Sequence, residues 1–290
     1  MLKVLVWQVS NDTSFKDKAI KILEQQHNGI EIVGEAVNED IAKVDGGGQY
    51  DVLLVVGAKQ KQIGMSKVTA DAHKLNLPEE KLLGDWIVCI PGFTLEKYRQ
   101  LQQLQISIFA SNCIGGFFSN SLGLPFRSPF VNLWLHSNDF FKFMLEPHSY
   151  VEKSLTYKGK TFDSRKTFEF PVAMLGDITL YMMHYKTFEE AVESWEARKK
   201  RINWNNLVVM MITTDEKIFK QFDALPYDKK ICFVPFKSDL DSAFYIEPRL
   251  TEKNPRFVDV VNASAQGYPF YYDMFDMLLY GKKTPLIDMK

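Results

Sequence analysis

The sequence predicts an α/β protein in which a small Rossmann-like N-terminal domain is followed by a second α/β domain. Short runs rich in apolar and β-branched residues occupy 2–8, 30–37 and 51–57, and helix-like stretches at 15–27 and 61–76 separate them. This alternation of strands and helices is typical of a parallel sheet covered by helices.

The first domain is predicted to end near residue 92. A further short strand is expected at 86–90, and Pro91-Gly92 follows it as a strong turn signal. The first strand is not followed by the GxGxxG turn of dinucleotide-binding folds, and Gly46–Gly48 precede a strand, where a flexible turn is the simpler interpretation. We therefore expect a domain over 1–92 that binds no nicotinamide or flavin, and we assign no cofactor.

The second domain is predicted to cover 93–240. A polar helix begins after Thr94 and leads into an apolar strand that ends near Ser111. Ser137 is expected to cap a helix over 138–146, which Pro147 would end.

Further along, 170–185 is predicted to form two strands separated by Gly176-Asp177. Thr187 and Glu190 have the spacing of a capping box, which predicts a helix over 188–202. Two more apolar strands are expected, at 206–213 and 230–235.

A C-terminal extension, 241–290, is expected to pack on the second domain through one apolar helical face. That face consists of Met274, Phe275, Leu278 and Leu279. Alternatively, this apolar face could form a dimer contact or a contact with a membrane enzyme. A homo-oligomer is therefore compatible with the sequence.

Composition narrows the class of protein. The 290 residues are 46% apolar and 24% charged, with a net charge of −1, which is typical of a globular protein and gives no basic field for nucleic acid. No run approaches the ~20 apolar residues of a membrane span, so we expect no transmembrane segment and a cytoplasmic location. The three cysteines lack CxxC or metal-type spacing, so we expect neither disulfides nor a metal site.

The segment 106–118, ISIFASNCIGGFF, carries the strongest chemical signal. It places Cys113 directly after an apolar strand, where a following helix start would lower the pKa of the thiol as nucleophilic cysteines require. Ser111 and Asn112 could bind a polar ligand, and the amides of Gly115 and Gly116 could stabilise an oxyanion. The alternative is that Cys113 is a packed thiol or only lines a binding site.

His184 is the favoured general base, because it ends the second strand of 170–185 and would emerge at the same sheet edge as Cys113. If Gly176-Asp177 is a hairpin turn, Asp177 and His184 lie at opposite ends of that strand, so only one of them can approach Cys113. Asp177 stays a candidate ligand-binding residue, and His136, which ends another apolar run, is a reserve base.

Three residues on the helix predicted over 188–202 suggest a ligand contact of another kind. Trp195, Arg198 and Arg201 are spaced by three, which would place them on adjoining parts of one face. An aromatic plane with two arginines suits a phosphate or a nucleotide base, whereas basic residues at a helix C-terminus also simply complement its dipole.

These motifs also occur in an order that resembles a known family. SNCIGG, LGLPFRSPF, LGDITLYMMHY and WEARKKRINWNN resemble a bacterial family of domains of unknown function associated with exopolysaccharide and capsule biosynthesis. The resemblance covers roughly residues 104–236 and implies a role in surface polysaccharide assembly, without a catalytic assignment. The positions that match its motifs are Asn112, Cys113, Gly115, Gly116, Ser128, Pro129, Gly176, Asp177, His184, Tyr185, Trp195, Arg198, Arg201 and Asn203.

Two functional hypotheses follow. The first is a transferase that uses a sugar nucleotide, an acyl-coenzyme A or a lipid-linked glycan, with acyl transfer favoured because Cys, His and free amides suit it best. The second is a non-catalytic module that binds a nucleotide or a glycan and regulates polysaccharide assembly. A redox-sensing thiol is a minor third hypothesis, because no resolving cysteine lies nearby in the sequence.

Overall fold

The computed structural model describes residues 1–8, 16, 17, 20, 21, 24, 29–37, 52–56, 95–122, 124–163, 168–246 and 273–283. Its helices, with both parallel and antiparallel sheets, agree with the predicted α/β class. The chain divides into one unit of residues 1–104, 118–124 and 263–288 and a second unit of residues 105–117, 125–262 and 289–290. The predicted limits at residues 92 and 240 stay predictions.

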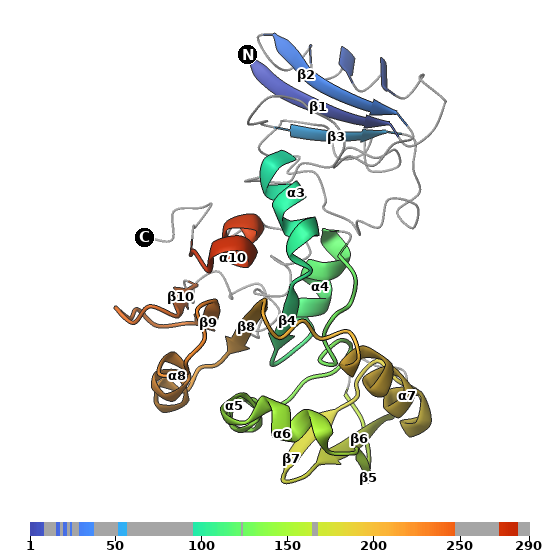
Figure 1. The fold of residues 1–290 in the computed structure, drawn as a ribbon, viewed down its shortest axis with the longest axis vertical. Coiled ribbons are helices and arrows are strands. Elements are labelled where there is room, and N and C mark those ends of the chain that lie inside the picture. Colours follow the sequence, from blue (N-terminus) through green and yellow to red (C-terminus); the bar gives the residue numbers. More distant parts are fainter. Residues whose placement is uncertain are drawn as a thin grey trace. The chain divides into compact units, whose positions relative to one another are not determined.

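A three-stranded parallel sheet belongs to the first unit (Figure 1). It consists of β1 (Leu2–Gln8), β2 (Ile30–Val37) and β3 (Val52–Val56), and β1 lies in the centre. All three strands agree with their predicted bounds to within one residue. Within the helix predicted over 15–27, the few described residues are helical. The helix over 61–76, the strand over 86–90 and Gly46–Gly48 lie outside the described residues.

Two helices of the first unit, α3 (Leu95–Leu104) and α10 (Met274–Tyr280), pack on each other. Lys97 Nζ lies 2.8 Å from Asp276 Oδ1 and 3.4 Å from Asp273 Oδ2. Asp273 also caps α10, because its carboxylate accepts the N–H groups of Phe275 and Asp276. The apolar face predicted for this helix is confirmed, since Met274, Phe275, Leu278 and Leu279 are all buried.

The second unit contains a four-stranded parallel sheet with the order β10-β9-β8-β4 (Figure 1). Its strands are β4 (Ser107–Ala110), β8 (Leu207–Ile212), β9 (Lys230–Val234) and β10 (Ala243–Tyr245). The helix α8 (Glu216–Asp223) connects β8 to β9. Nearly every residue of β4, β8 and β9 is buried, as expected for strands of a parallel sheet that is covered on both faces. Because all strands are parallel, their carboxyl ends meet at one edge of the sheet.

The connection from β4 to β8 begins with three helices. They are α4 (Ile114–Ser121), α5 (Ser137–Leu145) and α6 (Pro147–Glu152). The predicted cap of α5 is wrong, because His136 occupies the N-cap position, no side chain caps the helix, and Ser137 is its first residue. Pro147 does more than end α5, since it is the first residue of α6, where proline loses no helical hydrogen bond.

An antiparallel sheet follows, with the order β5-β6-β7. Its strands are β5 (Thr156–Thr161), β6 (Phe170–Leu175) and β7 (Ile178–Tyr181). Gly176-Asp177 is the hairpin turn between β6 and β7, and Gly176 adopts a left-handed φ of 62°. The two strands predicted within 170–185 are thus confirmed.

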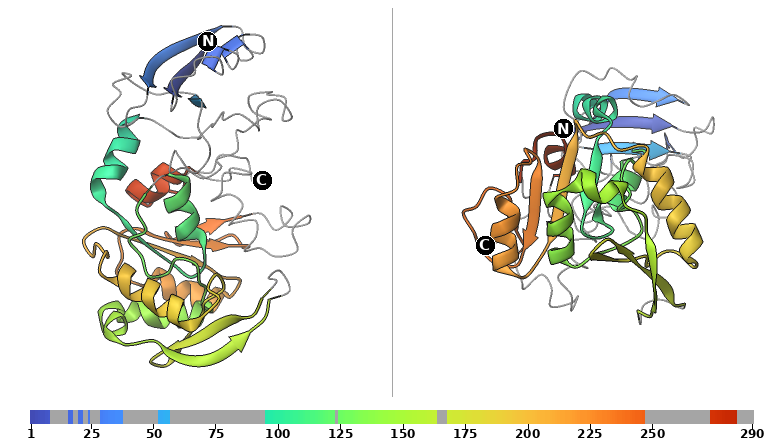
Figure 2. Two further views of the ribbon diagram at one scale, coloured as in Figure 1. Left: turned by 90° about the vertical axis from the view of Figure 1, so that its right-hand side faces the viewer. Right: turned by 60° about the horizontal axis from the view of Figure 1, so that its bottom comes forward.

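The helix α7 (Phe188–Lys199) lies against this antiparallel sheet (Figure 2). Its predicted cap is confirmed, because the Glu190 N–H donates to Thr187 Oγ1 over 3.2 Å. The Glu190 side chain in turn accepts the N–H of Lys186. The helix ends three residues earlier than predicted.

Candidate functional site

Cys113 stands between a buried strand and a helix. Its carbonyl accepts the N–H of Phe117 over 3.0 Å, which is the first hydrogen bond of α4, so Cys113 occupies the N-cap position. Asn112 Oδ1 accepts the N–H of Ile114 over 3.2 Å and thereby satisfies one donor of the first helical turn. The thiol side chain is half-buried and forms no disulfide with another cysteine of the described residues.

The start of α4 lies very close to β4. A Cβ atom on Gly115 would lie 3.0 Å from Ile108 Cγ2, 3.2 Å from the Ile108 carbonyl and 3.3 Å from Ala110 Cβ. A Cβ on Gly116 would meet only Val131 Cγ1, at an ordinary 3.5 Å. Gly115 is therefore required for the close approach of helix and strand that fixes the position of Cys113.

The structure brings Cys113 and His184 together. Cys113 Sγ lies 3.6 Å from His184 Nε2, within hydrogen-bond reach for sulfur, and His184 is exposed. The thiol also lies 3.8 Å from the carbonyl oxygen of Leu133, to which it can donate. An imidazole at this distance can take the thiol proton, which is the arrangement that activates nucleophilic cysteines.

Backbone contacts hold His184 in place after the end of β7. Its N–H donates to the carbonyl of Asn132 over 3.3 Å. Asn132 itself adopts a left-handed φ of 67°, which asparagine tolerates better than most residues. The next residue, Tyr185, is buried, and its hydroxyl donates to the carbonyl of Val131 over 3.3 Å.

Arg198 supports the same segment from α7. Its Nη1 donates to the Val131 carbonyl over 3.2 Å and to the Tyr185 hydroxyl. Val131 and Tyr185 are the chain neighbours of Asn132 and His184. Arg198 therefore holds the two segments that carry the histidine through its Nη1, and its role in a phosphate clamp stays a prediction.

The other two residues of the predicted ligand face lie elsewhere. Trp195 is 1% exposed and packs edge-on against Phe130, with ring centroids 5.7 Å apart, so it belongs to the core and offers no stacking surface. Arg201 is exposed and lies beyond the end of α7, where its N–H donates to the Arg198 carbonyl. The predicted common face fails because the helix ends at Lys199 and because tryptophan gains more from burial in the core.

Ser111 and Asn112 also serve the framework. Ser111 is 3% exposed, and its Oγ accepts the N–H of Ile212, which joins the carboxyl ends of β4 and β8. Asn112 is 7% exposed and its carboxamide oxygen caps α4. Both residues fix the loop that carries Cys113, and neither presents an exposed polar group to a ligand.

Asp177 lies at the opposite end of β7 from His184, as the hairpin requires. Its carboxylate accepts the Tyr150 hydroxyl over 2.6 Å and pairs with Lys142 Nζ over 3.1 Å. These contacts, the hydroxyl first, lower the pKa of Asp177 to about 2. Burial and the carboxylate together raise the pKa of Tyr150 to about 12. Asp177 therefore braces the hairpin against α6 and is not part of the Cys113 site.

His136, the reserve base, belongs to a surface aromatic cluster. Its Nε2 lies 3.4 Å from the Tyr181 hydroxyl, and its ring meets Trp134 edge-on. Trp134 stacks on Tyr181 with centroids 3.9 Å apart. These contacts link His136 to β7, and no contact in the described part of the chain links it to Cys113.

Sequence reasoning missed the segment 131–135, which runs beside Cys113. Leu133 contributes a carbonyl to the thiol, and Leu135 N–H donates to the Ser111 carbonyl. The one local signal was Asn132, a turn-forming residue inside an otherwise apolar run. Within the described residues, no group of three His, Cys, Asp or Glu side chains could hold a metal ion, and no helix could cross a membrane.

Comparison with known proteins places these residues in context. Residues 88–280 match the model of a domain of unknown function, DUF1919. An uncharacterized protein of Haemophilus influenzae is 34% identical over 183 residues, which cover 61% of this chain and 84% of the relative. The DUF1919 match includes both Cys113 and His184.

Proposed function

We propose that this chain, which belongs to the DUF1919 family, is a cytoplasmic acyltransferase of surface polysaccharide biosynthesis. Cys113 is the nucleophile and His184 is the general base. The polysaccharide role rests on the resemblance of the motifs. The reaction class rests on the site.

One observation carries the chemical part of this proposal. A half-buried thiol at the N-cap of α4 lies 3.6 Å from the imidazole of an exposed histidine. The partial positive charge at a helix N-terminus favours a thiolate, and an adjacent imidazolium stabilises it further. A purely structural cysteine needs neither an imidazole partner nor access to solvent.

The reaction has two steps. His184 takes the thiol proton, and Cys113 Sγ attacks the carbonyl carbon of an acyl thioester, such as an acyl-coenzyme A; the leaving thiolate then recovers that proton. In the second step His184 takes the proton of an acceptor hydroxyl, whose oxygen attacks the acyl group on Cys113. The ester leaves and the thiol regains its proton from His184.

The oxyanion of each tetrahedral intermediate would lie at the first turn of α4. Asn112 Oδ1 already accepts the Ile114 N–H, so that donor is engaged. Gly115 is buried, whereas Gly116 is half-buried. The Gly116 N–H is therefore the donor that we expect to bind the oxyanion.

Trapping of an acyl-enzyme tests the proposal. The full chain is incubated with acetyl-coenzyme A and longer acyl-coenzyme A thioesters, and the peptide that contains Cys113 is analysed by mass spectrometry. We expect a hydroxylamine-sensitive acyl adduct on Cys113 that His184→Gln strongly reduces. Cys232→Ala is the matched control, since Cys232 is fully buried and should leave the adduct unchanged.

Absence of an adduct on Cys113 with every thioester would contradict acyl transfer. Equal labelling of Cys113 in the wild type and in His184→Gln would contradict the role of the histidine. Binding of a sugar nucleotide without any covalent intermediate would indicate glycosyl transfer or a non-catalytic binding module.

A non-catalytic binding module is the second candidate. The observation that favours it is the use of nearby polar side chains within the framework, since Ser111 and Arg198 are both engaged by backbone groups. The order β2-β1-β3 of the N-terminal sheet is that of flavodoxin-like nucleotide-binding folds. This order supports a Rossmann-like N-terminal unit, whichever of the two functions the chain has.

A further inference from the structure

A pocket in the second unit lies at the other edge of the sheet from Cys113. Its walls include Asn205 and Leu207, at the start of β8, and Lys229, immediately before β9. Cys113 follows the carboxyl end of the parallel strand β4. Because β8 alone spans about 17 Å at ~3.3 Å per residue, a small ligand in this pocket cannot reach Cys113. The pocket is a separate site.

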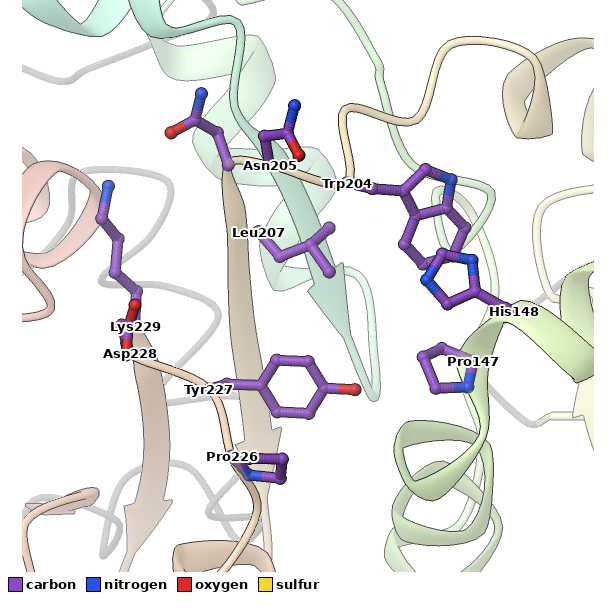
Figure 3. A pocket seen from close by; sticks show the side chains of 10 residues that line it. Pro147, His148, Trp204, Asn205, Leu207, Pro226, Tyr227, Asp228 and Lys229 are labelled. Carbon is purple, nitrogen blue, oxygen red and sulfur yellow. The ribbon is translucent and has the colours of Figure 1, made fainter.

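The pocket has the size of a small-molecule site, with a volume of about 410 Å³. Figure 3 shows Trp204, His148 and Pro147 on one side, Lys229 on the other, and Tyr227 and Pro226 below, with Leu207 directed between them. The pocket thus has an apolar ring-lined side and a cationic side.

Packing fixes the aromatic wall. The His148 ring lies on Trp204 with centroids 3.9 Å apart, and Trp204 meets the buried Phe109 edge-on at 5.7 Å. The Tyr227 hydroxyl donates to the Met144 carbonyl over 2.7 Å, which holds its ring across the pocket. Rings held in this way bind a flat group without losing side-chain entropy on binding.

The opposite wall carries a half-buried ammonium group. Burial lowers the pKa of Lys229, and the nearby carboxylate of Asp228 opposes this shift only in part. Among the described residues, no carboxylate forms an ion pair with Lys229. An anionic ligand group would offset the desolvation of this ammonium.

We infer that this pocket binds a small molecule that carries a flat ring and one anionic group, with the ring against Tyr227 and the His148–Trp204 pair and the anion at Lys229. A carboxylate and a phosphate share the chemistry that Lys229 recognises. This inference does not depend on the reaction proposed for Cys113.

The test measures dissociation constants of probes on the full chain by calorimetry or ligand-observed NMR. The ring-anion probes are 1-naphthoate, a carboxylate, and adenosine monophosphate, a phosphate. Their neutral counterparts are 1-naphthamide and adenosine, and the ring-free anions are acetate and inorganic phosphate. We expect at least one ring-anion probe to bind more than about tenfold tighter than both its neutral and its ring-free counterpart.

Variants assign the binding to the pocket. Lys229→Gln should remove the preference for the anion, and Asn205→Asp should weaken only the anionic probes by adding a negative charge to the lining of the pocket. Lys220→Gln, an exposed lysine on α8, is the charge-matched control and should change nothing. His148→Ala should weaken every ring-bearing probe.

Three results would overturn the inference: neutral and anionic probes of equal affinity, an unchanged anion preference in Lys229→Gln, or no saturable binding of either ring-anion probe below about 1 mM. Tighter binding of naphthoate would identify a carboxylate ligand, and tighter binding of adenosine monophosphate a phosphate. Either of these supports the inference.

Discussion

Replacement of Gly115 by alanine should destabilise the second unit and disturb the position of Cys113. The new Cβ would lie 3.0 Å from Ile108 Cγ2, 3.2 Å from the Ile108 carbonyl and 3.3 Å from Ala110 Cβ. The side chain of Ile108 can move, but the carbonyl and Ala110 Cβ belong to the framework of β4. Forcing a methyl group into such a contact costs about 1–3 kcal/mol.

Gly116→Ala is the matched control. Its Cβ would meet only Val131 Cγ1 at 3.5 Å, so the substitution creates no close contact. Both changes gain about 0.5–1 kcal/mol because alanine forms helix better than glycine. This gain cancels between the two variants, so their free energies of unfolding should differ by the packing cost of about 1–3 kcal/mol.

Urea denaturation followed by tryptophan fluorescence measures this difference, since Trp134, Trp195 and Trp204 report on the second unit. We expect Gly115→Ala to have the lower stability and Gly116→Ala to equal or slightly exceed the wild type. A Gly115→Ala protein as stable as Gly116→Ala would refute the close approach of α4 to β4.

Three further predictions concern candidate site residues for which the structure shows contacts within the protein framework. The Asp177 contacts stabilise the fold when the carboxyl is ionised, and they lower its pKa from 3.8 to about 2. This stabilisation is present above about pH 4 and is lost as the pH falls through 2. Asp177→Asn should therefore flatten the acid limb of the plot of unfolding free energy against pH. Trp195→Ala should cost about 3–5 kcal/mol in unfolding free energy, whereas Arg201→Ala should cost less than about 0.5 kcal/mol, and similar losses would contradict the burial of Trp195. Arg198→Met should slow alkylation of Cys113 by loosening the segments that hold His184; an unchanged rate would contradict its positioning role.

Much of the fold could be predicted because apolar runs and turn residues report local preferences directly. The strands at 2–8, 30–37 and 170–185, and the cap at Thr187, depend on neighbours within a few residues. The misassigned cap at Ser137 arose because a serine before a helical pattern is a common cap, whereas here His136 precedes it in extended conformation.

The site was predictable in part. Cys113 and His184 each end an apolar strand-like run, which predicted one common sheet edge. That edge is wrong, because β4 and β7 belong to different sheets, although the two side chains do meet. The use of Trp195 could not be predicted, because an aromatic residue on a helix faces either the core or a ligand, and only the tertiary packing on Phe130 decides between them.

The pocket could not be predicted as a site from the sequence. Its walls come from three separate stretches that include His148, Trp204 and Lys229. The stretch that contains Trp204 ends the WEARKKRINWNN motif, but the side chains of the three stretches meet only after the sheet and α6 have formed. A partner such as Tyr150 for Asp177 is equally distant in sequence and equally invisible without the fold.

The rate of Cys113 alkylation across pH measures whether His184 activates the Cys113 thiol. The rate is followed on the Cys113 peptide by mass spectrometry in the wild type and in His184→Gln, with the buried Cys232, whose pKa burial raises, as an unreactive internal reference. We predict that Cys113 reacts roughly tenfold faster in the wild type near neutral pH, because loss of the imidazole shifts the thiol titration by about one pH unit. Identical pH profiles for Cys113 in the two proteins would show that His184 does not activate the thiol.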